Sequence, residues 1–266
     1  MRLEVQRPLL GRYSLRVPAT EPATDLRKLL AAGERPGPRR VNRLIQLAVL
    51  GARRCVGEQQ PAPNTAVYLS SRGAHVGDTV DLLRRGAQGF PAAPVSFINA
   101  SGNMAGYYIA ADHGLHGGNH SLHALELAWF QLIQMATLAA SADQGILIGA
   151  VEECVWPLAE HRQRHGLPTD APMQESADFL WLGPRGATGP RQLDWIEAGQ
   201  DAQHPPTAAA AGEIGLAGAA DCLRWLAQSP AGGLWTEVSP SGAWGRLCIS
   251  SADSGEETDQ GQPGTV

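Results

Sequence analysis

The feature that most constrains the fold is a helix-length stretch that is apolar on almost every side. The stretch covers residues 125–141, with Glu126, Gln131 and Gln134 as its interruptions. Such a helix does not pack on a surface, because a large apolar area would remain in water. We therefore predict that this helix lies between two layers of secondary structure.

Apolar runs of strand length flank this helix along the chain. The runs 65–70 (TAVYLS) and 145–151 (GILIGAV) have the length and composition of buried strands. This alternation of strands and helices predicts an α/β layered fold with a largely parallel sheet. Weaker patterns add strands at 13–17, 118–124, 178–182, 234–238 and 246–250, and helices at 41–55, 77–86, 97–111 and 217–227.

The chain is expected to form one domain. Its 266 residues, 43% of them hydrophobic, are enough to bury a core. Residues 161–174 are predicted to form a connector, and the polar residues 253–266 a disordered tail. We therefore assign residues 1–252 to the folded domain.

Charge and cysteine usage argue against several classes of protein. The 21 basic and 26 acidic residues give a net charge of −5, whereas a nucleic-acid or membrane-surface binder normally carries a basic excess. No apolar run is long enough for a transmembrane helix, and the first residues lack the apolar core of a signal peptide. The cysteines are widely spaced without a CxxC pair, which is typical of reduced thiols in a cytoplasmic protein: Cys55, Cys154, Cys222 and Cys248.

The most conspicuous polar cluster consists of histidines that follow Asp112. Their spacing could place metal ligands on one face of a helix: His113, His116, His120 and His123. Glycines within 114–118 interrupt any helix there, and no cysteine is nearby. We interpret these residues as loop and strand histidines and predict no metal site.

Other short motifs carry little information. The chain contains no Walker A motif, no GxSxG elbow and no GxGxxG after a strand. Ser70 and Ser71 precede an Arg-Gly turn that resembles a nucleophile loop, but no His or Asp partner can be identified for them. The basic run 39–43 could bind an acidic partner, although a solvated helix start is the commoner role of such a run.

One long segment carries a family resemblance. Within residues 94–128, Asn103, the pair Ala105-Gly106, the run 114–119 (GLHGGN) and Ser121-Leu122 occur in the order found in ketoacyl synthases. The segment therefore resembles the ketoacyl synthases of the thiolase-like superfamily, in which the strand that follows ends at the nucleophilic cysteine.

Neighbouring segments extend this resemblance to about residues 40–155. Residues 43–48 resemble the first helix of the family, 65–73 its strand and glycine turn, and 146–153 its strand ending in Gly-Gly-x-Glu. Within 175–250, only separate pieces match.

The second half also lacks two motifs of the family. Its matching pieces are 175–182, 195–206 and 239–250. The His-Gly-Thr-Gly-Thr motif and the Lys/Gly-His motif, whose histidines activate the extender unit and hold the developing oxyanion, are missing. The resemblance implies a thiolase-like layered α/β fold with a complete N-terminal half and a reduced C-terminal half.

The nucleophile is missing as well. When the family motif is aligned with the chain from Gly114 without a gap, the nucleophile position falls at Glu126. An alignment error of about two residues would move that position within residues 124–128. None of these residues is cysteine. A carboxylate cannot replace the thiolate, because a glutamyl–acyl anhydride would hydrolyse, whereas a thioester can exchange its acyl chain.

This combination resembles the short chain-length-factor-like proteins of aryl polyene and xanthomonadin-type pigment gene sets. The resemblance implies a non-catalytic subunit without a cofactor, which forms a heterodimer with a ketosynthase and meets the acyl carrier protein only indirectly. It places the interface and the acyl tunnel along residues 99–125. The implied interface and tunnel residues are Asn103, Tyr107, Tyr108, Asn119, Ser121 and His123.

Tyr107 and Tyr108 are candidates for setting product length. Neighbouring residues on a helix point about 100° apart, so at most one of the two can close the tunnel while the other packs against the core. The alternative is that both are ordinary core or interface aromatics.

Two other functions stay open at this point. Glu126 could promote decarboxylation of a malonyl group on a carrier protein, with His120 or His123 donating to the enolate oxygen. The chain could also be a thiolase-fold remnant with a structural role. The sequence does not decide between a homodimer and a heterodimer.

Overall fold

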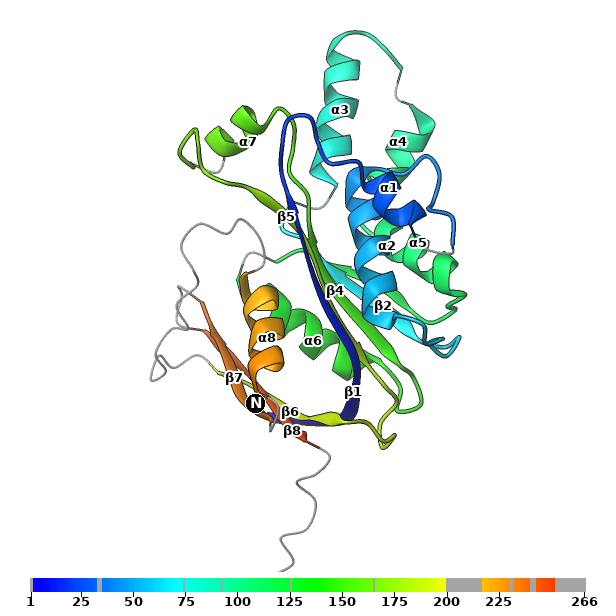
Figure 1. Cartoon of the computed structure of the whole chain (residues 1–266), viewed down its shortest axis with the longest axis vertical. Coiled ribbons are helices and arrows are strands. Elements are labelled where there is room, and N and C mark those ends of the chain that lie inside the picture. The colour runs from blue at the N-terminus through cyan, green and yellow to red at the C-terminus, as the bar shows by residue number, and fades with distance from the viewer. Residues whose placement is uncertain are drawn as a thin grey trace, which may run out of the picture.

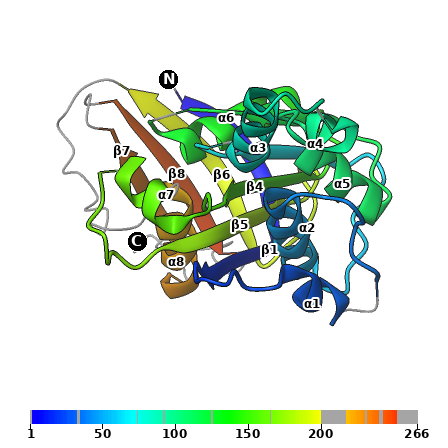
Figure 2. The same ribbon diagram turned by 90° about the horizontal axis from the view of Figure 1, so that it is seen from above.

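The protein is described from a computed structural model, in which helices and strands are arranged in layers (Figures 1 and 2). The predicted layered α/β architecture is confirmed. The predicted tail, 253–266, lies outside the described residues. The structure describes residues 2–32, 35–73, 75–91, 93–124, 126–164, 166–199, 217–229, 232–239 and 243–251.

The first half of the sheet contains the buried strands predicted from the apolar runs. β2 pairs in parallel with β3 and with β4, while β5 pairs antiparallel with β4 and with β1. Every residue of β2 and of β4 is buried. The strand order is β3 (Asn119–Leu122), β2 (Ala66–Ser70), β4 (Ile146–Glu152), β5 (Gln174–Leu182) and β1 (Arg2–Pro18).

β1 continues into the second half of the sheet. Its residues from Leu9 onward pair with β5, whereas Arg2 to Pro8 pair with β6. A bulge with Gln6 at a positive φ of 51° lies in the second of these pairings, and such a bulge bends a strand. The remaining strands follow in the order β6 (Arg191–Gly199), β8 (Trp244–Ser251) and β7 (Gly232–Val238).

A fully buried arginine stabilises this bend. The Arg7 guanidinium donates hydrogen bonds to the backbone oxygens of Gln144 (2.5 Å), Ser141 (2.7 Å) and Gly183 (3.1 Å). Burial lowers the pKa of Arg7. These hydrogen bonds to carbonyl oxygens compensate the free-energy cost of burying the Arg7 cation.

Helix α6 (Ala128–Ala139) lies between the two half-sheets, as its apolar surface predicts (Figure 1). It contacts β2 and β4 on one side and β8 on the other, and α8 (Ala217–Gln228) packs beside it. Trp129, Phe130 and Ile133 are at most 1% exposed, whereas Gln131 is exposed. The predicted position of this helix is therefore confirmed.

The other helices cover the first half-sheet or project from it. α2 and α5 pack on the face opposite α6, and α3 and α4 project beyond this layer (Figure 1). No helix of the described residues is long and apolar enough to cross a membrane. The bounds are α1 (Leu26–Ala31), α2 (Arg43–Val56), α3 (Val76–Ala87), α4 (Pro94–Asn99), α5 (Met104–His113) and α7 (Leu158–Arg164).

The second half of the sheet is smaller, as predicted. Helices α6 and α8 lie against its inner face. Its outer face carries arginines stacked on tryptophans: Arg2 lies 4.3 Å from the Trp195 ring and Arg246 lies 4.9 Å from the Trp244 ring. These cation–π contacts shield apolar rings on this face.

Several local predictions were wrong. The strand predicted at 13–17 spans Arg2–Pro18, because β1 pairs with β5 and β6 at once. The helix predicted at 97–111 is two helices, α4 and α5, separated by the turn 100–103. Most strand pairs are antiparallel rather than parallel, and β6 and α7 were not predicted.

Candidate functional site

The polar residues of the first half-sheet gather at the carboxyl ends of its parallel strands. Ser70 and Ser71 follow β2, His123 follows β3, and Glu152 ends β4. Because the carboxyl ends of parallel strands meet at one edge of a sheet, these side chains come together there. Ligands of open α/β sheets commonly bind at this edge.

A small cavity lies at this edge. Its lining includes Ser70, Ser71, His75, Ser121 and His123, together with apolar residues of α2, α5 and β4. Its volume is about 10 Å³, which is room for about one water molecule. An acyl chain cannot enter a space of this size.

Ser71 has a polar partner that the sequence did not identify, whereas the buried Ser70 hydroxyl has no hydrogen-bond partner among the described residues. The Ser71 hydroxyl lies 3.5 Å from Glu152 Oε2, and the backbone N–H of Arg72 donates to Glu152 Oε1 at 2.5 Å. His123 Nδ1 lies 2.9 Å from the backbone oxygen of Ser71, not from its hydroxyl. The Ser71 hydroxyl is therefore paired with the Glu152 carboxyl at the long distance of 3.5 Å and not with His123 Nδ1.

Burial controls the charge of this cluster. It raises the pKa of Glu152 to about 7, although the N–H groups of Arg72 and Gly73 donate to the carboxylate. It lowers the pKa of His75 to about 4, with a smaller contribution from the nearby His123. His75 is therefore neutral at neutral pH.

Glu153 and Asn42 hold two helix starts at the cluster. Glu153 accepts hydrogen bonds from the N–H groups of Leu44 (3.1 Å) and Gly77 (3.1 Å), at the beginnings of α2 and α3. Asn42 caps α2 through the N–H of Ile45 (2.8 Å). Helix N-termini leave N–H groups unpaired, so these contacts stabilise the fold at this edge.

Asn42 also ties the cluster to α3. Its Nδ2 donates to Asp78 Oδ2 at 2.7 Å and lies 2.9 Å from His75 Nδ1, which must then be the acceptor. Desolvation raises the pKa of Asp78, while this bond opposes the shift. The contacts of Asn42, His75 and Asp78 thus connect helices rather than face open solvent.

The basic run at 39–43 has divided roles. Arg39 and Arg40 are exposed, as a solvated helix start predicts. Arg43 instead pairs with the fully buried Glu175 through two hydrogen bonds, at 2.5 and 2.6 Å. Two parallel bonds of this kind fix geometry, so Arg43 joins α2 to β5 and is not part of a docking patch.

The strand-to-helix turn before α6 contains the region predicted for the nucleophile. Leu127 caps α6 in the left-handed conformation, with φ 48° and ψ 29°, which is unusual for a leucine. Its side chain is buried in the core that surrounds α6. Glu126, at the predicted position, is exposed to solvent, and Leu125 lies outside the described residues.

The implied interface residues bind β3 to the turn before α5. Asn119 Nδ2 donates to the backbone oxygen of Asn103 at 3.0 Å, and the Ser121 hydroxyl donates to that of Gly102 at 2.6 Å. β3 is the first strand of the sheet order, so its outer edge faces away from β2. The structure therefore places Asn103, Asn119 and Ser121 together at a sheet edge.

The two tyrosines of α5 have different surroundings. Tyr107 is 55% exposed, whereas Tyr108 packs against the core between α2 and the sheet. Their rings meet edge to face with centroids 5.5 Å apart. Tyr107 therefore has more of its ring available to another molecule than the partly buried Tyr108.

The four histidines do not form one cluster. His113 is buried at the end of α5, and His120 stacks on Tyr68 at 4.7 Å. Across the described residues, no group of three or more His, Cys, Asp or Glu side chains could hold a metal ion.

Comparisons with known proteins identify structures that have a similar fold. No protein-family model and no curated protein matches the chain. The structure matches "The ishigamide ketosynthase/chain length factor" with a TM-score of 0.63 at 16% identity, covering 86% of each chain. It matches "Ketosynthase (ApeO) in Complex with its Chain Length Factor (ApeC) from Xenorhabdus doucetiae" with a TM-score of 0.60 at 15% identity, covering 92% of this chain and 100% of the other.

A third match is "Crystal structure of a Beta-ketoacyl synthase from Burkholderia phymatum STM815", with a TM-score of 0.57 at 12% identity, covering 94% of this chain and 100% of the other. At such identities the likeness defines the fold. The chain has the thiolase-like fold of ketosynthases and chain length factors, as its sequence predicts.

The raised pKa of Glu152 predicts how stability depends on pH. Its ordinary pKa is 4.5, and in the folded protein it is about 7. Between these values the folded state holds a proton that the unfolded chain has released, so this group lowers stability as pH rises, by at most about 1.4 kcal/mol per pH unit.

Glu152→Gln imitates the neutral form, so its stability relative to wild type should increase between pH 5 and pH 8. Urea unfolding across this range measures the difference, and Glu58→Gln, at an exposed position, controls for the loss of a carboxylate. Parallel pH profiles for wild type and Glu152→Gln would contradict the assignment.

Proposed function

We propose that this chain is a non-catalytic, chain-length-factor-like subunit that pairs with a ketosynthase. The observation that carries the proposal is the turn before α6, which has a buried Leu127 in the left-handed conformation and no cysteine from 124 to 128. Without a cysteine at this turn, no acyl thioester can form at the nucleophile position. The nearby cavity of about 10 Å³ also has no room for an acyl chain.

Two surface features support a partner subunit. The edge strand β3 can extend its sheet into another chain, because an unpaired edge is a template for strand addition. α5, which contacts β3, exposes Tyr107, and α4, which contacts α5, exposes Phe97 (67%) and Ile98 (51%). Adjacent exposed aromatic and aliphatic residues are typical of an interface core. The proposed interface, 99–125, therefore extends back into α4.

Several similar structures are of a ketosynthase with a chain length factor, which supports a heterodimer. We further propose that the pair acts in fatty-acid or polyketide-type synthesis of an aryl polyene or xanthomonadin-type pigment, on the resemblance of the sequence. The acyl carrier protein is proposed to meet the ketosynthase rather than this chain. Reduced cysteines, none of them in a disulfide, favour the cytoplasm.

The decarboxylase alternative requires Glu126 to act in a desolvated site. Glu126 is exposed, and His123 Nδ1 already contacts the backbone of Ser71. An exposed side chain does not provide the water-excluded site that this chemistry requires. The geometry therefore favours the partner-subunit role. If the chain were instead a structural remnant of the fold, it would bind no ketosynthase, and this would distinguish it from a partner subunit.

The purified chain should be inactive by itself. Incubation with acyl- and malonyl-loaded carrier protein should give no condensation product, no acyl adduct and no released carbon dioxide above a no-protein control. Intact-protein mass spectrometry and product chromatography provide the measurements. A stable acyl adduct would contradict the proposal, and decarboxylation abolished by Glu126→Gln would favour the alternative.

Phe97→Asp should weaken association with the ketosynthase of the native host by about tenfold or more, since it places a charge in a desolvated contact. Its exposure means that the monomer should keep its stability. Leu234→Asp, on β7 at the opposite end of the strand order and 55% exposed, is the matched control and should leave the Kd unchanged. Equal Kd values for wild type and Phe97→Asp would exclude α4 from the interface.

Alanine substitution of each tyrosine should separate an effect on product length from an effect on the stability of the protein. Tyr107→Ala should shift the products of the reconstituted pair to longer chains, because its more exposed ring is the better placed to close a tunnel. Tyr108→Ala should mainly cost stability, about 2 kcal/mol for a partly buried aromatic. Product lengths and urea unfolding measure the two effects, and unchanged lengths in a folded, paired Tyr107→Ala would remove Tyr107 from the tunnel.

A further inference from the structure

Helices α3 and α4, which we call the arm, extend beyond the layer formed by α2 and α5 (Figure 1). No residue of α3 is buried, and among the helices α3 packs mainly on α4. A helix without buried side chains gains little stability from packing, so its position depends on the polar contacts that hold it. These contacts therefore decide whether α3 stays in place on the rest of the protein.

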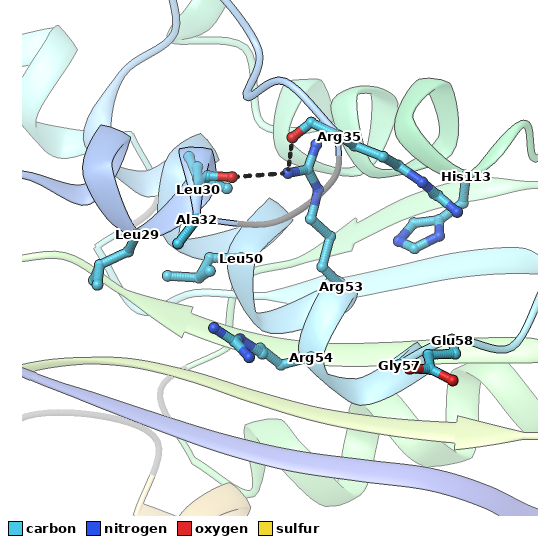
Figure 3. Close-up of a pocket in the computed structure, with 10 residues that line it drawn as sticks. All are labelled: Leu29, Leu30, Ala32, Arg35, Leu50, Arg53, Arg54, Gly57, Glu58 and His113. Carbon is cyan, nitrogen blue, oxygen red and sulfur yellow. Dashed lines mark hydrogen bonds between the residues drawn. The ribbon is translucent and has the colours of Figure 1, made fainter.

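Helix α1 is anchored in a different way. Its side chains Leu26 and Leu30 are buried. Arg53 of α2 donates to the backbone oxygen of Leu30 at 3.3 Å (Figure 3) and also to the Asp112 carboxylate at 2.8 Å. Apolar burial and a balanced ion pair thus hold α1 in place.

The start of α3 is held instead by two carboxylates. Glu153, directly after β4, accepts a hydrogen bond from the N–H of Gly77 at 3.1 Å, and a Cβ at Gly77 would lie 3.1 Å from the same oxygen. Asp78 accepts from Asn42 Nδ2 at 2.7 Å. The first turn of α3 therefore lies directly on Glu153, and in these contacts both carboxylates accept from uncharged groups.

Two further contacts connect the arm to the rest of the protein. The exposed Arg84 of α3 pairs with Glu160 of α7 at 2.9 Å, and exposed ion pairs contribute little to stability. At the end of α4, the buried Asn99 donates to the backbone oxygen of Arg40 at 2.9 Å. The end of α4 is thus anchored, and the position of α3 depends mainly on the contacts at its start.

The surroundings of Glu153 oppose its ionisation. The residue is partly exposed, but its carboxyl group lies beneath Gly77. Desolvation of this group raises the pKa of Glu153 to about 8, although the N–H of Gly77 opposes the shift. The charges of Asp78 on α3 and Glu175 on β5 raise this pKa further, and the N–H of Leu44 on α2 lowers it.

Two neighbouring basic residues do not neutralise these carboxylates. Arg43 of α2 is bonded to Glu175 through two of its nitrogens. Burial lowers the pKa of His75, which precedes α3, to about 4, so its ring is neutral at neutral pH. Ionising Glu153 therefore places a second negative charge near Asp78, and moving α3 away would let water reach both groups.

The direction of the pH effect follows from proton linkage. With α3 in place, Glu153 keeps its proton up to about pH 8, whereas the ordinary pKa of a glutamate is 4.5. Between these values the placement of α3 on Glu153 takes up a proton, so a rise in pH favours the release of α3.

We propose that the start of α3 is a proton-dependent latch, which holds α3 on the sheet edge while Glu153 is protonated and releases it when Glu153 and Asp78 are both ionised. The latch belongs to the isolated chain, so it does not depend on the proposed pairing with a ketosynthase. Because α4 carries Phe97 of the proposed interface, the latch also affects how firmly that surface is held.

Hydrogen–deuterium exchange of the full chain at pH 6 and pH 8.5, corrected for intrinsic exchange rates, tests the latch. The protection of α3 should fall by at least about tenfold between the two pH values, within the limit of about tenfold per pH unit for one proton. At both pH values α3 should be less protected than the core helix α6, because α3 opens without global unfolding. Unchanged protection of α3, or protection equal to that of α6, would overturn the proposal.

Variants assign the effect to the two carboxylates. Glu153→Gln keeps an acceptor oxygen but cannot ionise, so the protection of α3 should become nearly independent of pH. Asp78→Asn, at a partly exposed position, should reduce the pH dependence and supplies the test if Glu153→Gln does not fold. Glu160→Gln, which removes the exposed partner of Arg84, is the matched control and should keep the wild-type dependence. The wild-type dependence in both Glu153→Gln and Asp78→Asn would overturn the proposal.

Discussion

Helix α6 is apolar over most of its surface, and it packs between the two half-sheets while Gln131 and Leu138 are exposed. Its buried side chains belong to one core that includes residues from both half-sheets. This enclosure is possible because β1 belongs to both halves and bends at the bulge near Gln6. Arg7 holds the bend by donating to backbone oxygens of neighbouring loops. The position of α6 in turn fixes where the strand-to-helix turn with Leu127 lies.

On the proposed function, the chain keeps this scaffold without condensing chemistry of its own. Side chains that look catalytic at the sheet edge act as structural contacts. Glu153 and Asn42 cap helices, and Glu152 pairs with the turn after β2. The raised pKa values of Glu152 and Glu153, about 7 and about 8, follow from burial. A perturbed pKa is a weak guide to catalysis when every contact of the group is accounted for in this way.

Strongly apolar segments could be predicted from the sequence because burial alone determines them. The strand at 145–151 and the helix at 125–141 are of this kind, and the structure places both in the core. The length of β1 could not be predicted, since a strand shared by two half-sheets changes its buried side at the bulge and loses a simple alternation. The partners of Ser71 were missed because they depend on the pairing of β2 with β4 and β3.

The most direct test of the partner-subunit account is hydrogen–deuterium exchange on the chain alone and co-purified with the ketosynthase of its native host. The account predicts a one-to-one complex by native mass spectrometry and strong protection of β3, α4 and the start of α5 on pairing. It also predicts unchanged exchange in β7 and β8, at the other end of the strand order. A chain that forms no complex with the ketosynthase, or one whose protection lies on β7 and β8, would contradict the account.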